Sequence, residues 1–419
     1  MRGAWLGLLV YGCFASHERP LEDGGVPVSP RDGAAPVVDA GDGGVDAARP
    51  TEPLFPGLPP LDDPTPLPPP EPEPSDPGSW EPTPAPGEPG GSCCASTPHE
   101  LETPDRFEWH AAWTGASWRV AIQDGTATER PRAILRVVSP EGGTTRAREL
   151  DPFYVFEIAH APGRLGVLGA PFDPTQAMAP PLVLLVFDDR LALREQHLVP
   201  FAPTFAAPYR LFADVRDGSW RVYAPDSVRR RLLVHVTSEG SERREIETDV
   251  WFATSFAESM VFATDEAFLA EIEPLRLARE VPARGTLAGL THGRRRAIGY
   301  VLERGTLRVA RFTGTDTLLG GLFRARVDRR LLDVAFEERR AVHVTCDLEG
   351  RSTQLGQLEA AAFNDEGALL GVVPLSSSGD ACRVGVIEDG RYAVMWSDAS
   401  ETLEWPRSTA LHTAVLTTR

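Results

Sequence analysis

Short apolar runs alternate with acidic turns along residues 105–419, and this pattern predicts an all-β domain. In Ile134–Val138 followed by SPEG, and again in Leu232–Val236 followed by TSEG, an apolar strand leads into a turn that ends in glycine. Glycine accepts the positive φ that tight hairpins need. The pattern recurs with turn positions 40 to 65 residues apart, at Gly142, Arg190, Gly240, Gly305, Gly350 and Gly390.

A second strand precedes several of these hairpins, so each unit of 40 to 50 residues holds three or four short strands. The additional strands are SWRVAI (Ser117–Ile122), RLGVLG (Arg164–Gly169) and SWRVYA (Ser219–Ala224). Such a small sheet cannot bury both faces alone, whereas stacking the units around an axis covers every face. We therefore expect six units in a closed ring, with seven as the near alternative and tandem β-sandwiches as the rival architecture.

One run near the end of the chain is similar to sequences of a known class of repeat protein. GRYAVMWSD (Gly390–Asp398) is similar to blade sequences of large secreted bacterial β-propellers, and SWRVAIQD and SWRVYAPD resemble weaker copies. The resemblance implies a six-bladed, alternatively seven-bladed, β-propeller and indicates no particular activity. Helical signals are sparse, and the clearest is Asp265–Arg279, which lies in the longest gap between turns and is interrupted by Pro274. We expect an inserted helical element there.

The chain before residue 105 has a different composition. Residues 14–104 contain 23 of the 39 prolines and 17 acidic residues against three arginines, a net charge of −14 out of −18 for the whole chain. Few large apolar groups are present to offset the entropy of ordering, so we expect a disordered Pro-rich and acidic linker. The folded part has no cationic surplus to neutralise phosphates, which argues against a nucleic-acid partner.

The first 13 residues resemble the signal peptide of a bacterial lipoprotein. Arg2 precedes a short apolar run that ends in Leu9-Val10-Tyr11-Gly12-Cys13, where a small residue stands before the cysteine that would carry lipid. An ordinary secretory signal is the alternative. The resemblance implies a location at the outer membrane or cell surface. Lipoproteins of this kind that are retained inside usually have Asp directly after the lipid-bearing cysteine, and this chain has Phe14 there. We expect an extracytoplasmic protein that contacts the membrane only through this lipid.

Four further cysteines are candidates for disulfides in that oxidising compartment: Cys93, Cys94, Cys346 and Cys382. Three pairings are open, one of which contains a vicinal bond. We favour the two pairings that join Cys93 and Cys94 to Cys346 and Cys382, since these would fasten the end of the linker onto the last repeats. Their spacing does not suit zinc.

Motifs of known catalysts are missing from the sequence, which contains no His-Glu-x-x-His, Gly-x-Ser-x-Gly, Gly-x-Gly-x-x-Gly or Walker loop. We therefore assign no catalytic or metal-binding residue and expect no cofactor. Acidic residues at hairpin tips could form a carboxylate site, although turn chemistry explains them without a substrate. These are Asp188, Asp189, Glu239, Glu349 and Asp389.

Other residue types have a structural and a functional interpretation. Trp109, Trp113 and Trp118 either pack between blades or line a sugar-binding strip, and packing is favoured. We take His235 and His343 to be equivalent core or rim residues. The arginine groups Arg229–Arg231 and Arg294–Arg296 fit a solvated strand edge better than an anion site.

Three functional hypotheses follow. The first is a tethered binding or adhesion module whose loop face receives an unidentified protein or glycan. The second is a structural or assembly component of the envelope. The third is a hydrolase or lyase whose carboxylates converge only in the folded chain, in a pocket where their pKa values are perturbed.

Overall fold

The computed structural model describes residues 60–62 and most of residues 94–418. The gaps within the second range are residues 127–129, 173–180, 201–208, 226–230, 257–258, 265–266, 283–285, 293–296, 304–305, 314–315, 324–328, 338, 340–341, 350–354, 365–367 and 401–407. The described residues contain only strands, and no helix long and apolar enough to cross a membrane is found among them.

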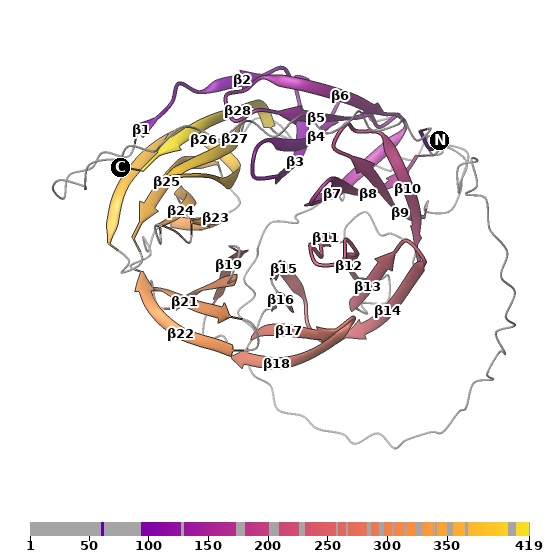
Figure 1. The fold of residues 1–419 in the computed structure, drawn as a ribbon. Coiled ribbons are helices and arrows are strands. Elements are labelled where there is room, and N and C mark those ends of the chain that lie inside the picture. The colour runs from indigo at the N-terminus through magenta and orange to yellow at the C-terminus, as the bar shows by residue number, and fades with distance from the viewer. Residues whose placement is uncertain are drawn as a thin grey trace, which may run out of the picture.

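The strands form a ring of small antiparallel sheets, called blades here (Figure 1). In blades 1 to 6 the strands follow chain order from the axis outward, because consecutive apolar runs joined by short turns pair with one another. The first three blades are blade 1, with β3 (Phe107–Trp113), β4 (Trp118–Asp124), β5 (Ala133–Val138) and β6 (Thr144–Leu150); blade 2, with β7 (Phe153–Ala161), β8 (Arg164–Pro171), β9 (Leu182–Asp188) and β10 (Leu193–Val199); and blade 3, with β11 (Arg210–Ala213), β12 (Trp220–Pro225), β13 (Arg231–Thr237) and β14 (Gly240–Ile246).

The next three blades continue the ring in the same way. They are blade 4, with β15 (Val250–Phe256), β16 (Ser259–Thr264), β17 (Ala267–Glu273) and β18 (Arg276–Pro282); blade 5, with β19 (Thr286–His292), β20 (Ala297–Glu303), β21 (Thr306–Thr313) and β22 (Asp316–Phe323); and blade 6, with β23 (Arg329–Glu337), β24 (Val342–Glu349), β25 (Gly356–Phe363) and the first part of β26 (Leu369–Glu388).

Blade 7 closes the ring with strands from both ends of the chain. The second part of β26 pairs with β27 (Arg391–Ala399), which pairs with β28 (Ser408–Thr417). Its outermost position is filled by β1 (Cys94–Ala95) and β2 (His99–Leu101), which both pair with β28. The ring therefore uses residues before 105, ahead of the predicted domain boundary.

The fold is the predicted β-propeller, and the described strands form seven blades. Seven was the near alternative to the expected six, and the count of six arose because the turn positions that suggested it are not equivalent. Gly142 lies between a third and a fourth strand, Gly240 begins the fourth strand of blade 3, and Gly390 lies between the first and second strands of blade 7. Gly305 and Gly350, outside the described residues, fall between second and third strands. The apparent repeat drifts along the blades and omits blade 4.

The omitted blade also contains the segment that was expected to be helical. Asp265 and Glu266 lie outside the described residues. The residues from Ala267 to Arg279 form β17 and part of β18, with Leu275 at a positive φ of 60° in the turn between them. β17 pairs with β16 on one side and β18 on the other. Pairing on both sides of the strand overrides the helical preference of its Ala, Leu and Glu residues.

The apolar core lies between neighbouring blades. β9 shows how a single strand serves two of these interfaces: Val183, Leu185 and Phe187 pack toward blade 1, whereas the alternate residues Leu184 and Val186 pack toward blade 3. Because β9 has an apolar neighbour on both faces, it is apolar from Leu182 to Phe187. Similar clusters join blades 3 and 4, 6 and 7, and 7 and 1. Tandem sandwiches are excluded by this cyclic arrangement.

Candidate functional site at the ring axis

The innermost strands of the blades surround the axis of the ring (Figure 1), and several of these strands contain charged residues. They come from five of the seven blades and are all partly buried rather than freely exposed. We call them the axial cluster, which consists of Glu108 and His110 on β3, Glu157 on β7, Arg210 on β11, Asp333 on β23 and Arg383 on β26.

His110 stands between two carboxylates at the centre of this cluster. Its Nδ1 lies 3.5 Å from Glu157 Oε1, and its Nε2 lies 3.7 Å from Glu108 Oε1. Arg210 approaches the other oxygen of Glu157, with a distance of 3.5 Å from its guanidinium nitrogen to Oε2. The backbone N–H of Ile158 also donates to Glu157 Oε1 at 3.2 Å. Glu157 thus connects the inner strands of blades 1, 2 and 3.

The opposite side of the cluster is formed by Asp333 and Arg383. The backbone N–H of Val384 donates to Asp333 Oδ2 at 2.8 Å, which links blade 6 to blade 7. Arg383 donates to the carbonyl oxygen of Cys382 at 3.2 Å. Its positive charge influences the pKa values of His110, Glu157 and Asp333, so it lies within electrostatic range of three other inner strands.

The environments of the two glutamates shift their pKa values in opposite directions. Burial alone would raise the pKa of Glu157, but hydrogen bonding to His110 and the charges of His110, Arg210 and Arg383 outweigh it and lower the value to about 2. Burial raises the pKa of Glu108 because His110 offsets it only in part. Burial would lower the pKa of His110, yet the two carboxylates raise it. Opposed shifts of this kind are typical of functional sites.

Burial also raises the pKa of Asp333, with Arg383 and backbone N–H groups opposing it. The axial cluster can therefore bind a charged group or exchange a proton. No group of three or more His, Cys, Asp or Glu side chains suited to a metal ion occurs in the part of the chain that the structure describes.

The acidic residues predicted at hairpin tips are not brought together. They lie on four different blades. Asp188 shows the turn chemistry that explains them: its Oδ1 accepts the backbone N–H groups of Arg190 and Ala192, at 2.8 and 2.9 Å. Asp189 pairs with Arg119 at 3.0 Å, and Asp389 adopts a positive φ of 55° in its turn. Glu239 and Glu349 are exposed at their own hairpins.

The three tryptophans pack between blades, as favoured from the sequence. Trp118 is buried and meets Trp113 edge-on, with 4.9 Å between ring centroids. The indole N–H of Trp113 donates to the Val386 carbonyl at 2.7 Å, and its ring lies where a Cβ on Gly385 would stand. Trp109 belongs to the same apolar cluster between blades 7 and 1. They do not form an exposed sugar-binding strip.

The remaining predicted polar residues have local roles. His235 and His343 are buried, but they lie on a third and a second strand, so they are not equivalent. Arg231 makes a bidentate pair with Asp249, with N–O distances of 2.8 and 3.0 Å. Arg229, Arg230 and Arg294–Arg296 lie outside the described residues, as does Cys13.

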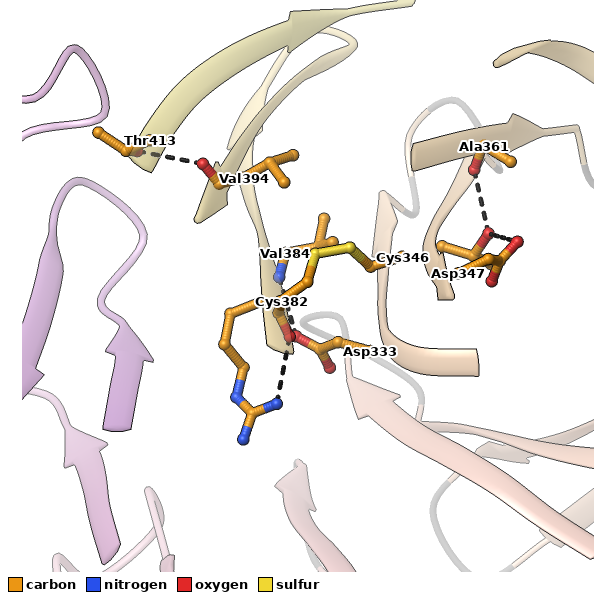
Figure 2. The surroundings of a disulfide bond; sticks show 10 residues. Asp333, Cys346, Asp347, Ala361, Cys382, Val384, Val394 and Thr413 are labelled. Carbon is orange, nitrogen blue, oxygen red and sulfur yellow. Dashed lines mark hydrogen bonds between the residues drawn. A yellow bond between two sulfur atoms is a disulfide. The ribbon is translucent and has the colours of Figure 1, made fainter. Parts of the chain in front are cut away.

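The disulfide joins two of the four candidate cysteines in an unexpected way. Cys346 of β24 is bonded to Cys382 of β26, with 6.3 Å between their Cα atoms (Figure 2). The favoured pairings with Cys93 and Cys94 are therefore wrong. Cys93 lies outside the described residues, and Cys94 lies in β1. Because β24 belongs to blade 6 and this part of β26 to blade 7, the disulfide connects neighbouring blades beside Asp333.

Sequence reasoning missed the function of the Ser-Trp-Arg runs and the axial cluster. In both runs the arginine donates to the hydroxyl of the serine two residues earlier and reaches an acidic residue of the next blade. The repetition of Ser-Trp-Arg was the available signal. The axial residues gave a weaker sequence signal, a charged residue inside an apolar strand. That signal identifies a site only when it is known which strands are innermost.

Comparisons with known proteins report only distant similarity. No protein-family model matches this chain, and no curated protein matches it. The chain is similar to Raptor of Chaetomium thermophilum, with 9% identity over 78% of this chain and 29% of that chain and a TM-score of 0.49. It thus spans less than a third of the Raptor chain. It is also similar to the Pan2 WD40 domain of Neurospora crassa (7% identity, 78% and 89% of the two chains, TM-score 0.48) and to Hsv2 of Kluyveromyces lactis (11%, 69% and 88%, TM-score 0.47).

Proposed function

We propose that this protein is a binding module tethered to the bacterial cell envelope. Lipid on Cys13 anchors it, the residues between Cys13 and β1 connect that anchor to the ring, and the face around the axial cluster receives an acidic group of a protein or glycan. The closed ring supports this proposal, because rigid inner strands hold the axial charges in place before a ligand arrives.

The proposal rests on the hydrogen bonding and ion pairing of Arg383. Its hydrogen bond to the Cys382 carbonyl occupies one of five N–H donors, and among the described residues no carboxylate lies within ion-pair distance of its guanidinium. Arg210 differs, since it is already paired with Glu157. Arg383 therefore has the donors to bind a carboxylate or sulfate of a partner in bidentate fashion.

Binding at the axis is tested with the full chain and two acidic probes, oligogalacturonate and a poly-glutamate peptide. We expect Arg383→Gln to weaken binding of the recognised probe at least tenfold, because a charge-assisted bidentate contact is lost. Arg130→Gln is the matched control, since Arg130 is exposed and lies in blade 1 away from the axis. Equal binding by the two variants would contradict the axial site.

The anchor is tested separately in cells. We expect the wild-type chain in the membrane fraction, and the Cys13→Ser variant in the soluble extracytoplasmic fraction with a signal that is poorly removed. Mass spectrometry of the mature N-terminus should show a lipid-modified Cys13. An unmodified N-terminus at another residue would refute the anchor and leave the axial binding site untouched.

Hydrolase or lyase activity is a second candidate, favoured by the opposed pKa shifts of Glu108 and Glu157 around His110. Two carboxyl groups whose pKa values are shifted in opposite directions can divide the roles of acid and base between them. Screening the full chain against chromogenic glycosides tests it, and true activity must disappear in both Glu108→Gln and Glu157→Gln. Turnover that survives both substitutions would come from a contaminant.

A further inference from the structure

A short segment far ahead of the ring lies against its outer rim. The backbone N–H of Asp62 donates to the Leu193 carbonyl at 3.1 Å, and the Leu193 N–H donates to Asp62 Oδ2 at 2.6 Å. Arg148 makes an ion pair with the same carboxylate oxygen. Leu61 packs against the apolar cluster between blades 1 and 2. Two adjacent residues thus supply an apolar anchor and a charged one.

The receiving groups are held in place by contacts of their own. Arg148 on β6 also donates to the Leu191 carbonyl at 2.9 Å, and its guanidinium lies over the Phe187 ring, 5.4 Å from the centroid. The turn that carries Leu191 is fixed by the Asp188 carboxylate, which binds the Ala192 N–H. Since these contacts do not involve residues 60–62, the arginine is oriented toward the rim independently of the segment that it binds.

Leu193 supplies the backbone part of the recognition. It begins β10, the outer edge of blade 2, and stands opposite Phe187 of β9 at an irregularity in the pairing. Its N–H and C=O are both bonded to Asp62. An edge strand whose outward groups pair with an added segment is a recurring mode of peptide binding, in which main-chain bonds give affinity and side-chain pockets give specificity.

We propose that the rim formed by Arg148, Leu191 and Leu193 is a recognition site for an extended Leu-Asp peptide, and that residues 60–62 occupy it in cis. The site is separate from the axial cluster and does not depend on the proposed function. Thirty-one residues lie between Asp62 and Cys94. Because the segment and the rim belong to one chain, the effective concentration of the segment is on the order of 1 mM, so it competes strongly with peptides in solution.

The test uses the full chain with its own segment disabled by Leu61→Ala and Asp62→Ala, together with a fluorescent peptide of residues 56–66 (PGLPPLDDPTP). Anisotropy should show at least tenfold tighter binding to this disabled variant than to wild type, where the site is occupied. Adding Arg148→Gln to the disabled variant should lower the affinity at least tenfold.

The peptide itself contains a matched control, because two aspartates stand side by side. Asp62→Asn in the peptide should abolish binding, whereas Asp63→Asn should leave it within twofold. Hydrogen exchange of the Leu193 amide is a second measurement: it should be slow in wild type and at least tenfold faster in the full-length Asp62→Asn variant. The proposal fails if the disabled variant, with unchanged thermal unfolding, does not bind the peptide, or if the Asp62 and Asp63 changes have equal effects.

Discussion

Arg221 and Arg119 occupy the same place in two Ser-Trp-Arg runs, yet the carboxylates that they reach differ in exposure. Arg221 meets both oxygens of Glu271 at 2.9 Å, and the side chains of both residues are 1% exposed. Arg119 meets Asp189, whose side chain is 56% exposed. Solvent screens the second pair and not the first. The same sequence context therefore gives two ion pairs that contribute unequally to the stability of the fold.

We expect Arg221→Ala to destabilise the fold by about 3 to 5 kcal/mol, because it removes the bidentate partner of the buried Glu271 carboxylate. The remaining contacts of that carboxylate include the Leu275 N–H at 2.7 Å and Arg216 at 3.8 Å. Arg119→Ala should cost about 1 kcal/mol or less. Urea unfolding of the two full-length variants measures the difference, and the equivalent position of the two arginines makes each the control of the other. Similar losses in both would show that burial of the pair does not decide its contribution.

His160 on β7 makes stability depend on pH. Burial lowers its pKa to about 4, with help from the nearby Arg119 charge and some opposition from Asp189. The unfolded chain binds a proton near pH 6.5, so between pH 6.5 and 4 only the unfolded state is protonated. The stabilisation is complete above pH 6.5 and is lost as the pH falls toward 4, by at most about 3 kcal/mol.

Comparing wild type with His160→Gln isolates this effect from the other titrating groups. The free energy of unfolding of the wild type should fall more steeply between pH 7 and pH 4.5, because the variant has no imidazole to protonate at that position. Urea midpoints at the two pH values give the two slopes. Parallel profiles would mean that His160 keeps its ordinary pKa in the folded protein.

A disulfide and a side-chain hydrogen bond join particular strands of blades 6 and 7. The Cys346–Cys382 disulfide joins β24 to β26, and the Tyr392 hydroxyl on β27 donates to the Val342 carbonyl on β24 at 3.2 Å. The cysteines are 36 residues apart, for which loop-closure entropy gives about 4 kcal/mol in a model that is disputed. The bond should strengthen the interface between these blades in particular.

Replacing both cysteines by alanine should therefore lower the free energy of unfolding by up to about 4 kcal/mol. The measurement is urea unfolding with and without reductant. Wild type should lose stability when reduced, and the Cys346→Ala, Cys382→Ala variant should not respond. A reductant effect that persists in the variant would have to come from Cys93 and Cys94.

At the level of elements, the sequence predicted strands well where the local pattern and the packing agree. SWRVAI, RLGVLG and SWRVYA are β4, β8 and β12, equivalent second strands whose apolar residues meet neighbouring blades. β17 lies in the segment that was expected to be helical, and its Glu271 faces another blade rather than solvent. That glutamate is buried by its pair with Arg221 of another blade, a contact that local patterns do not contain.

The whole ring determines features that no single repeat contains. Glu157 and Arg383 are 226 positions apart in the chain and come within electrostatic range only after blades 7, 1 and 2 have come together. The same holds for Asp62 and Arg148 at the rim. A β-propeller with an acidic extension could therefore be predicted from the sequence, while the residues that meet at its axis could not.

Closure by β2 is the feature of the whole molecule most open to test. Leu101 of β2 is buried in the cluster between blades 7 and 1, and its strand covers the edge of β28. A chain that starts at residue 105, the boundary suggested by composition, lacks this strand. It should lose about 3 kcal/mol from one buried leucine and its strand pairing, and the exposed β28 edge should promote self-association.

The matched control is a chain that starts at residue 90, which keeps β1 and β2 but removes the segment that occupies the rim. Urea unfolding and size-exclusion chromatography compare the two truncated chains with the full protein. Because closure depends on β2, the chain from residue 90 should remain monomeric and near full stability, and the shorter one should not. If both behave alike, the outer strand of blade 7 contributes little and the ring is held closed by the contacts of β26, β27 and β28 with blades 6 and 1.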